Sequence, residues 1–178
     1  MKKHLIYIIC IISLLMPDNL YGNDIRTETY NGRTITEVFH APSSDIQWYE
    51  YKIDGYYLKA DSIKQNKRAF SDVTGYPLWN NPDHKNAYID FREYIRNSFK
   101  DNSKISSTED LLQDCCYLIN DDGEVVCYKI ETSRSLFDFM TPANILDFFD
   151  EINSFAFPTP VVRIPENGVG YEDVRIYF

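Results

Sequence analysis

Two histidines lie beyond the first 22 residues, and neither has the neighbours that histidine chemistry requires. His40 alternates with Val38 in a run of β-branched and aromatic residues, and His84 follows Asp83 in an Asp-rich loop. A catalytic histidine needs a nucleophile or a metal within reach, and no motif supplies either. The chain also lacks the G-x-S-x-G, H-E-x-x-H and glycine-rich phosphate motifs. The sequence therefore predicts no catalytic residue, no cofactor and no enzymatic activity.

An acidic run around one glycine, Asn120-Asp121-Asp122-Gly123-Glu124, has the composition of a cation-binding loop. A calcium loop needs carboxylates at alternate positions, a distant bidentate Glu and two flanking helices, and the flanking sequences here are strand-like. Asp-Gly is also the pair that favours a two-residue hairpin turn, because both residues tolerate positive φ. We therefore expect a turn at this position and no metal site.

Three cysteines, Cys115, Cys116 and Cys127, lie beyond the first 22 residues. They are too few, and spaced too unlike a C-x-x-C pair, to predict a metal centre. An odd number in an oxidising compartment leaves at least one free thiol or an intermolecular bond. The sequence does not decide how these thiols pair.

Aromatic residues are abundant, with 14 Tyr, 11 Phe and 2 Trp. Five of them crowd one predicted hairpin: Trp48, Tyr49, Tyr51, Tyr56 and Tyr57. Rings on a sheet face stack on sugars or form a protein-binding patch. Tyrosines also cover half-buried sheets with no further role, because their rings are amphipathic. This set is a candidate contact surface, and both interpretations remain open.

Composition and charge exclude several classes of protein. Among 178 residues, 44% are hydrophobic and 25% are charged, which excludes collagen, low-complexity disorder and a multi-span membrane protein. The formal net charge of −9 repels phosphate backbones, so we expect no nucleic-acid partner. The excess is concentrated in residues 86–178, which hold 17 acidic and 8 basic residues. Either a solvated surface or a basic protein partner accounts for it.

The first 22 residues are typical of a secretory signal peptide. A basic start at Lys2 and Lys3 precedes the apolar run Leu5–Met16, which is too short to cross a bilayer as a helix. Cleavage is expected near Gly22, which leaves a mature chain that is exported, periplasmic or secreted, and not anchored in the membrane. Cys10 lies within the apolar run, without the small residues that a lipidation site needs before it.

Residues 23–82 are predicted to form a β-rich amino-terminal region. The run Thr34–His40 alternates as a strand does. A second run, Gln47–Ile53, is followed by Asp54-Gly55 and then by Tyr56–Ala60, which predicts a hairpin. A turn-rich stretch ending at Pro82 is a plausible domain boundary.

Residues 83–178 are predicted to begin with a helix and a hairpin. Over residues 85–99, one helical face carries Phe91, Tyr94, Ile95 and Phe99. Strands over residues 115–120 and 124–131 then pair around the acidic turn. In the predicted register Ile119 faces Val126, Tyr117 faces Tyr128 and Cys115 faces Ile130. Cys116 and Cys127 are then diagonal neighbours on the opposite face, and only a distorted disulfide would join them.

A second helix and a closing strand complete this region. Thr141-Pro142 is typical of a capped helix start, and Phe157-Pro158 of its end. Val174 to Phe178 then alternate as a strand. The predicted fold class is α+β: a small antiparallel sheet with two helices packed on one face, preceded by the β-rich amino-terminal region.

The order of elements in residues 83–178 resembles the carboxy-terminal domain of TonB and its periplasmic relatives. The resemblance rests on the amphipathic segment Phe91–Phe99, the hairpin Tyr117–Glu131 and the helix ending at Phe157-Pro158. It also includes the aromatic closing strand Val174–Phe178. The Tyr-Pro that usually follows the family's first helical segment is replaced by Phe99-Lys100-Asp101.

The resemblance implies a non-catalytic protein that binds an envelope protein partner in a Gram-negative bacterium. In that family an exposed sheet edge pairs with an extended segment of the partner. The expected contact here is the closing strand: Val174, Arg175, Ile176, Tyr177 and Phe178. Two alternatives remain open, an exported acidic inhibitor or immunity protein and a glycan-binding module that uses the aromatic hairpin. The partner, the role of residues 23–82 and the oligomeric state do not follow from the sequence.

Overall fold

The structure is a computed structural model, and it describes residues 24–69, 82–105, 111–120, 122–157 and 170–178. The predicted signal peptide, residues 1–22, lies outside the described residues and stays a prediction. None of the helices in the described ranges combines the length and the apolar character that a membrane crossing requires.

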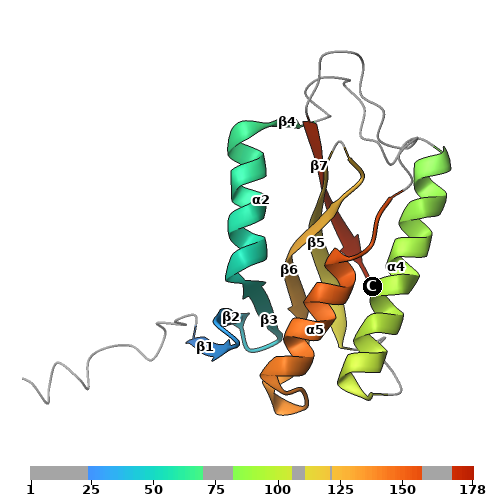
Figure 1. The fold of residues 1–178 in the computed structure, drawn as a ribbon. Coiled ribbons are helices and arrows are strands. Elements are labelled where there is room, and N and C mark those ends of the chain that lie inside the picture. The colour runs from blue at the N-terminus through green and yellow to red at the C-terminus, as the bar shows by residue number, and fades with distance from the viewer. Residues whose placement is uncertain (1–23, 70–81, 106–110, 121, 158–169) are drawn as a thin grey trace, which may run out of the picture.

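In the described residues, seven strands form one sheet in the order β1-β2-β3-β6-β5-β7-β4 (Figure 1). All neighbouring strands are antiparallel except β4 and β7, which are parallel. The sheet is therefore larger than the small antiparallel sheet predicted, and it is mixed. Pairing of β3 with β6 puts strands from both sides of the predicted boundary at Pro82 into this sheet. The strands are β1 (Asp24–Tyr30), β2 (Arg33–Ser43), β3 (Ile46–Ile53), β4 (Arg68–Ala69), β5 (Leu112–Asn120), β6 (Val125–Thr132) and β7 (Gly170–Tyr177).

Helices cover both faces of the sheet, where the prediction placed two helices on one face. Helices α4 (Pro82–Ser103) and α5 (Pro142–Asn153) pack together over one face, and α2 (Asp54–Asn66) lies against the other (Figure 1). A short 3₁₀ turn, η2 (Leu136–Asp138), precedes α5. The fold is thus mixed α and β, with unequal layers on the two sides of the sheet.

The main core lies between the sheet and the α4–α5 layer. Phe91, Ile95 and Phe99 of α4 are fully buried, which confirms the predicted helical face. Helix α5 begins as predicted, with Pro142 in its first turn and the Thr141 hydroxyl accepting the Asn144 amide. The smaller core under α2 joins Ala60, Leu118 and Val126.

The predicted hairpin at Asp54-Gly55 is wrong, because the chain enters helix α2 at Asp54 directly from β3. An acidic residue in the first turn of a helix is favoured by the helix dipole. Packing of α2 on β6 then stabilises helix over strand in Tyr56–Ala60. The predicted strand Thr34–His40 is confirmed within β2.

The hairpin of β5 and β6 forms as predicted, but its register differs at the turn end. Cys115 faces Ile130 as expected, whereas Tyr117 faces Cys127 and Ile119 faces Val125. The register shifts at a β-bulge beside Cys116. The extra residue is in β6, so residues on the turn side of the bulge meet partners one position earlier than in an unbroken ladder.

Beyond the end of β3, the backbone of β6 is paired by a side chain of α5. The Asn153 Oδ1 accepts the Cys127 amide at 2.7 Å, and its Nδ2 donates to the Cys127 carbonyl at 3.3 Å. Asn153 also donates to the Phe149 carbonyl at 2.7 Å, within its own helix. One amide therefore satisfies both main-chain groups of a buried residue and ties α5 to the sheet.

Replacing Asn153 with Leu should lower the free energy of unfolding by about 2 kcal/mol, because the Cys127 amide loses its acceptor in a buried position. Ser154→Ala, at the next position, removes an exposed hydroxyl that bonds only within its helix turn and with Tyr94. That variant should cost about 0.5 kcal/mol or less. Urea denaturation of both variants measures the difference, and equal losses would show that the Asn153 contacts do not stabilise β6.

Candidate functional site

Strand β7 has one buried row of side chains and one partly exposed row. Val174 and Ile176 point into the core beneath α4, with exposed fractions of 7% and 0%. Arg175 and Tyr177 point to the opposite face, where Tyr177 is 66% exposed. Phe178 packs against the core, and the guanidinium groups of Arg92 and Arg96 lie over its ring. The five predicted contact residues are therefore divided between two faces of the sheet.

The backbone of β7 alternates in the direction of its hydrogen bonds. The Phe178 amide donates to the Gln113 carbonyl at 3.0 Å, so the even-numbered residues of β7 bond toward β5. Residues at odd positions then direct their amides and carbonyls away from β5. For Asp173, Arg175 and Tyr177, this direction is the outer edge of the strand.

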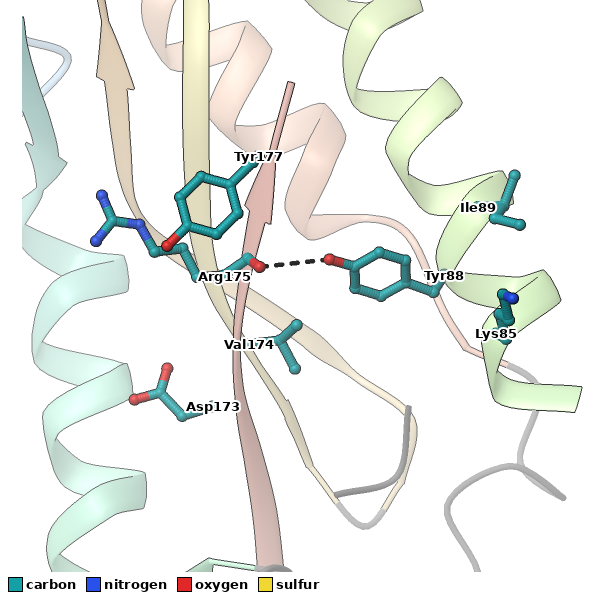
Figure 2. Close-up of a pocket in the computed structure, with 7 residues that line it drawn as sticks. All are labelled: Lys85, Tyr88, Ile89, Asp173, Val174, Arg175 and Tyr177. Carbon is teal, nitrogen blue, oxygen red and sulfur yellow. Dashed lines mark hydrogen bonds between the residues drawn. The ribbon is translucent and has the colours of Figure 1, made fainter. Parts of the chain in front are cut away.

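Strand β4 covers only the start of that outer edge. Its two residues pair with Gly170 and Tyr171 of β7, and no other described strand lies on this side. Within the described part of the chain, the edge from Asp173 to Tyr177 therefore has no strand neighbour. A side chain of α4 reaches it instead: the Tyr88 hydroxyl donates to the Arg175 carbonyl at 3.3 Å (Figure 2).

A groove of about 760 Å³ runs along this edge, between β7 and α4 (Figure 2). Burial raises the pKa of Tyr88, so its hydroxyl keeps the proton that it donates. Ile89 is 48% exposed at the rim, although large apolar side chains are usually covered. The described lining residues are Lys85, Tyr88 and Ile89 of α4 and Asp173, Val174, Arg175 and Tyr177 of β7.

The side chains of Asp173 and Arg175 are held on the α2 side of the sheet and leave the outer backbone edge uncovered. Asp173 accepts the Tyr128 hydroxyl at 2.9 Å and pairs with Lys64 of α2 at 2.8 Å. Arg175 donates to Asp114 through Nε at 2.9 Å and to Glu131 through Nη2 at 2.9 Å. These contacts fix the position of β7 without using its outward amides and carbonyls.

Asp114 and Glu131 both bind the Arg175 guanidinium, and their pKa values are shifted in opposite directions. Burial raises the pKa of Asp114 despite the hydrogen bond from Arg175. Burial would also raise the pKa of Glu131, but the hydrogen bond and charge of Lys129 outweigh it and lower that pKa. The Asp114 carboxylate in turn raises the pKa of Arg175. The positive charges of Arg175 and Lys129 thus offset the negative charges of Asp114 and Glu131.

The predicted aromatic set does not form one surface. Trp48 stacks on His40 with ring centroids 4.8 Å apart, whereas Tyr51 is fully buried on the other face. Tyr49 packs on Phe39. Tyr56 and Tyr57 lie on helix α2, and not on the second strand of the predicted hairpin. The side chains are thus spread over a strand's two faces and a helix.

His40 and the acidic turn have local structural roles. His40 Nε2 lies 3.8 Å from Glu50 Oε2, and Lys52 pairs with the same glutamate at 2.5 Å. His84 lies in the first turn of α4, so the predicted loop there is wrong. At the turn, Asn120 Oδ1 accepts the amides of Asp122 and Glu124. No group of three potential metal ligands gathers in the part of the chain that the structure describes.

The α4 wall of the groove was not predicted. Tyr88 falls on the same helical face as Phe91 and Ile95, so the sequence places it in the core. Ile89 lies off that face, and an apolar residue on the polar side of an amphipathic helix is the one sequence feature that points to a contact surface. Its position beside β7 depends on the tertiary fold.

No protein-family model, curated protein or solved structure matches this chain.

Proposed function

We propose that the protein is a non-catalytic binding protein of the bacterial envelope that holds an extended segment of a partner protein against β7. The observation that carries this proposal is the edge from Asp173 to Tyr177, which no described strand covers. An extended segment placed there gains main-chain hydrogen bonds and becomes a further strand of the sheet. The short length of β4 supports this position for the segment, because β4 ends after pairing with Tyr171.

The groove indicates the side chains that such a segment would carry. Side chains of an added strand alternate between two faces, so every second one enters the groove beside α4. Tyr88, Ile89 and Val174 offer apolar contacts there, and Lys85 offers a cation at the rim. On the other face, the Tyr177 ring is exposed. A segment with apolar residues at alternate positions and an acidic residue near Lys85 fits this arrangement best.

The envelope location is part of the proposal and rests on sequence features. Residues 1–22 resemble a signal peptide, and residues 83–178 resemble a family of periplasmic partner-binding domains. The net charge of −9 favours encounter with a partner that is basic around its extended segment.

A peptide-display selection on the purified protein tests this function and reveals the sequence pattern that the edge prefers. Random twelve-residue peptides are selected, synthesised with a fluorophore and titrated by fluorescence polarisation. We expect selected peptides to carry alternating apolar residues and to perturb the amide NMR signals of Asp173, Arg175 and Tyr177. The protein itself should sediment as a monomer, because the proposed occupant of the β7 edge is a different chain.

Replacing Tyr177 with Pro should weaken binding of the selected peptide at least about tenfold, as expected for loss of a main-chain hydrogen bond and a close contact at the edge. The proline removes an amide that points away from β5, so the fold should tolerate it. Tyr177→Ala is the matched control, since it loses the same ring and keeps the amide. The proline variant should bind several times more weakly than the alanine variant.

Three results would contradict the proposed function. Peptides whose binding is equal in the two Tyr177 variants would not use the β7 backbone. Perturbations centred on Trp48 would favour the glycan-binding alternative. Concentration-dependent dimerisation that Tyr177→Pro abolishes would show that the edge pairs with a second copy of this chain.

A further inference from the structure

The three cysteines beyond residue 22 are all buried, and two of them are in contact. The Sγ atoms of Cys115 and Cys127 lie 3.2 Å apart, and both residues have an exposed fraction of 0%. Cys116 lies on the other face of the sheet with an exposed fraction of 6%. A disulfide needs a sulfur–sulfur distance of about 2.05 Å, which small rotations of two adjacent side chains can reach.

The bulge in β6 explains why these two cysteines meet. In an unbroken ladder Cys127 would face Leu118, on the same side of the sheet as Cys116. The bulge makes Tyr117 the partner of Cys127 instead, which moves the Cys127 side chain to the face of Cys115. Cys127 therefore contacts Cys115, whereas the predicted register placed it near Cys116.

In the ladder, Cys115 and Cys127 are diagonal neighbours on one face of the sheet, because Cys115 faces Ile130 and Cys127 faces Tyr117. Cys115 directs its backbone groups toward Ile176 of β7, because that pair belongs to the hydrogen-bonded set. It is therefore in a non-hydrogen-bonded position relative to β6, where the strands approach closely enough for diagonal side chains to touch, as the two Sγ atoms do. Both cysteines belong to the main apolar core, between the sheet and the α4–α5 layer.

We propose that Cys115 and Cys127 form an intrachain disulfide under oxidising conditions, which leaves Cys116 as the free thiol among the three. The oxidant is a disulfide of another molecule, such as oxidised glutathione or a thiol oxidase. The thiolate of one cysteine attacks that disulfide and releases a thiol. The second cysteine then attacks the mixed disulfide, so two protons and two electrons leave the chain and the oxidant becomes two thiols.

This thiol–disulfide exchange takes place during folding, before β5 and β6 are buried. In the folded protein both sulfurs are inaccessible, and burial raises the pKa of Cys115, so little thiolate forms there. Burial likewise raises the pKa of Cys116 to about 11, which keeps that thiol unreactive near neutral pH. Once formed, the bond between β5 and β6 is shielded from soluble reductants.

Refolding of the reduced protein in a glutathione redox buffer tests the proposal. The product is denatured, alkylated with iodoacetamide and weighed. We expect one of the three cysteines to be alkylated without dithiothreitol and all three with it. Trypsin leaves these thiols in one peptide, residues 105–129, because no Lys or Arg lies between them. Cleavage after Glu124 by a glutamyl endopeptidase separates Cys115 and Cys116 from Cys127 and yields a linked pair of peptides.

Matched variants identify the bonded cysteine. Cys116→Ser should retain the linked peptides, and Cys115→Ser should lose them. If Cys115→Ser does not fold, fragmentation of the wild-type linked peptides between residues 115 and 116 gives the same assignment. The oxidised protein should also melt roughly 5–10 °C above the reduced protein. Three alkylated cysteines after oxidation, a Cys116–Cys127 link or an intermolecular dimer would each overturn the proposal.

Discussion

Gly123→Ala should lower the free energy of unfolding by about 3 kcal/mol or more, measured by urea denaturation. Gly123 has φ of +79°, and a Cβ there would lie 2.6 Å from the Phe157 carbonyl oxygen. Positive φ costs a residue with a side chain about 1–2 kcal/mol, and overpacking against fixed groups adds about 1–3 kcal/mol. The Phe157 amide donates to the Gly123 carbonyl at 2.9 Å, so neither backbone can move away without losing that bond.

Gly32→Ala separates the two costs. Gly32 has φ of +73°, and a Cβ there would meet nothing within 4 Å. Its substitution should cost only the conformational part, about 1–2 kcal/mol. If both glycine variants lose the same free energy, the contact between the β5–β6 turn and Phe157 does not constrain the fold.

Tyr51→Phe should lower the free energy of unfolding by about 3 kcal/mol, because it breaks a buried polar cluster at two points. The Tyr51 hydroxyl donates to the Glu37 carboxylate and accepts the Leu136 amide at 2.6 Å. The Ser135 hydroxyl donates to the same carboxylate at 2.5 Å. With phenylalanine, Glu37, which is only 6% exposed, retains one of these hydroxyl donors, and the Leu136 amide loses its acceptor.

Tyr49→Phe is the matched control for this cluster. Tyr49 lies two residues earlier on β3, and its half-buried ring packs on Phe39. Loss of its hydroxyl should cost about 0.5 kcal/mol or less. The double variant Glu37→Gln with Tyr51→Phe should recover part of the loss, since a neutral amide is less costly to bury than a carboxylate. Equal effects of the two tyrosine variants would show that the Tyr51 hydroxyl does not stabilise the fold through Glu37 and Leu136.

Local pattern was enough to predict most strands and the helices of the second half. The face of α4 with Phe91 and Phe99 and the capped start of α5 at Thr141 follow from periodicity and capping, which act within a few residues. The alternation of Val174 and Ile176 likewise predicted which face of β7 is buried.

The sequence predictions were wrong or incomplete where contacts between distant residues determine the structure. Tyr56–Ala60 suits a strand or a helix, and packing of α2 on β6 selects the helix. The bulge beside Cys116 leaves no pattern in a single strand, so the predicted register was wrong at the turn end. The groove at Tyr88 and Ile89 requires α4 to lie beside β7, which no local pattern specifies.

The inserted residue in β6 has a consequence for both surfaces of the sheet. At the bulge, Tyr128 and Lys129 project to one side in succession, where they reach Asp173 and Glu131. In a strand without the bulge, one of these two side chains would point into the apolar core. A single extra residue in β6 therefore keeps Tyr128 and Lys129 together on one face of the sheet and places Cys127 on the other, beside Cys115.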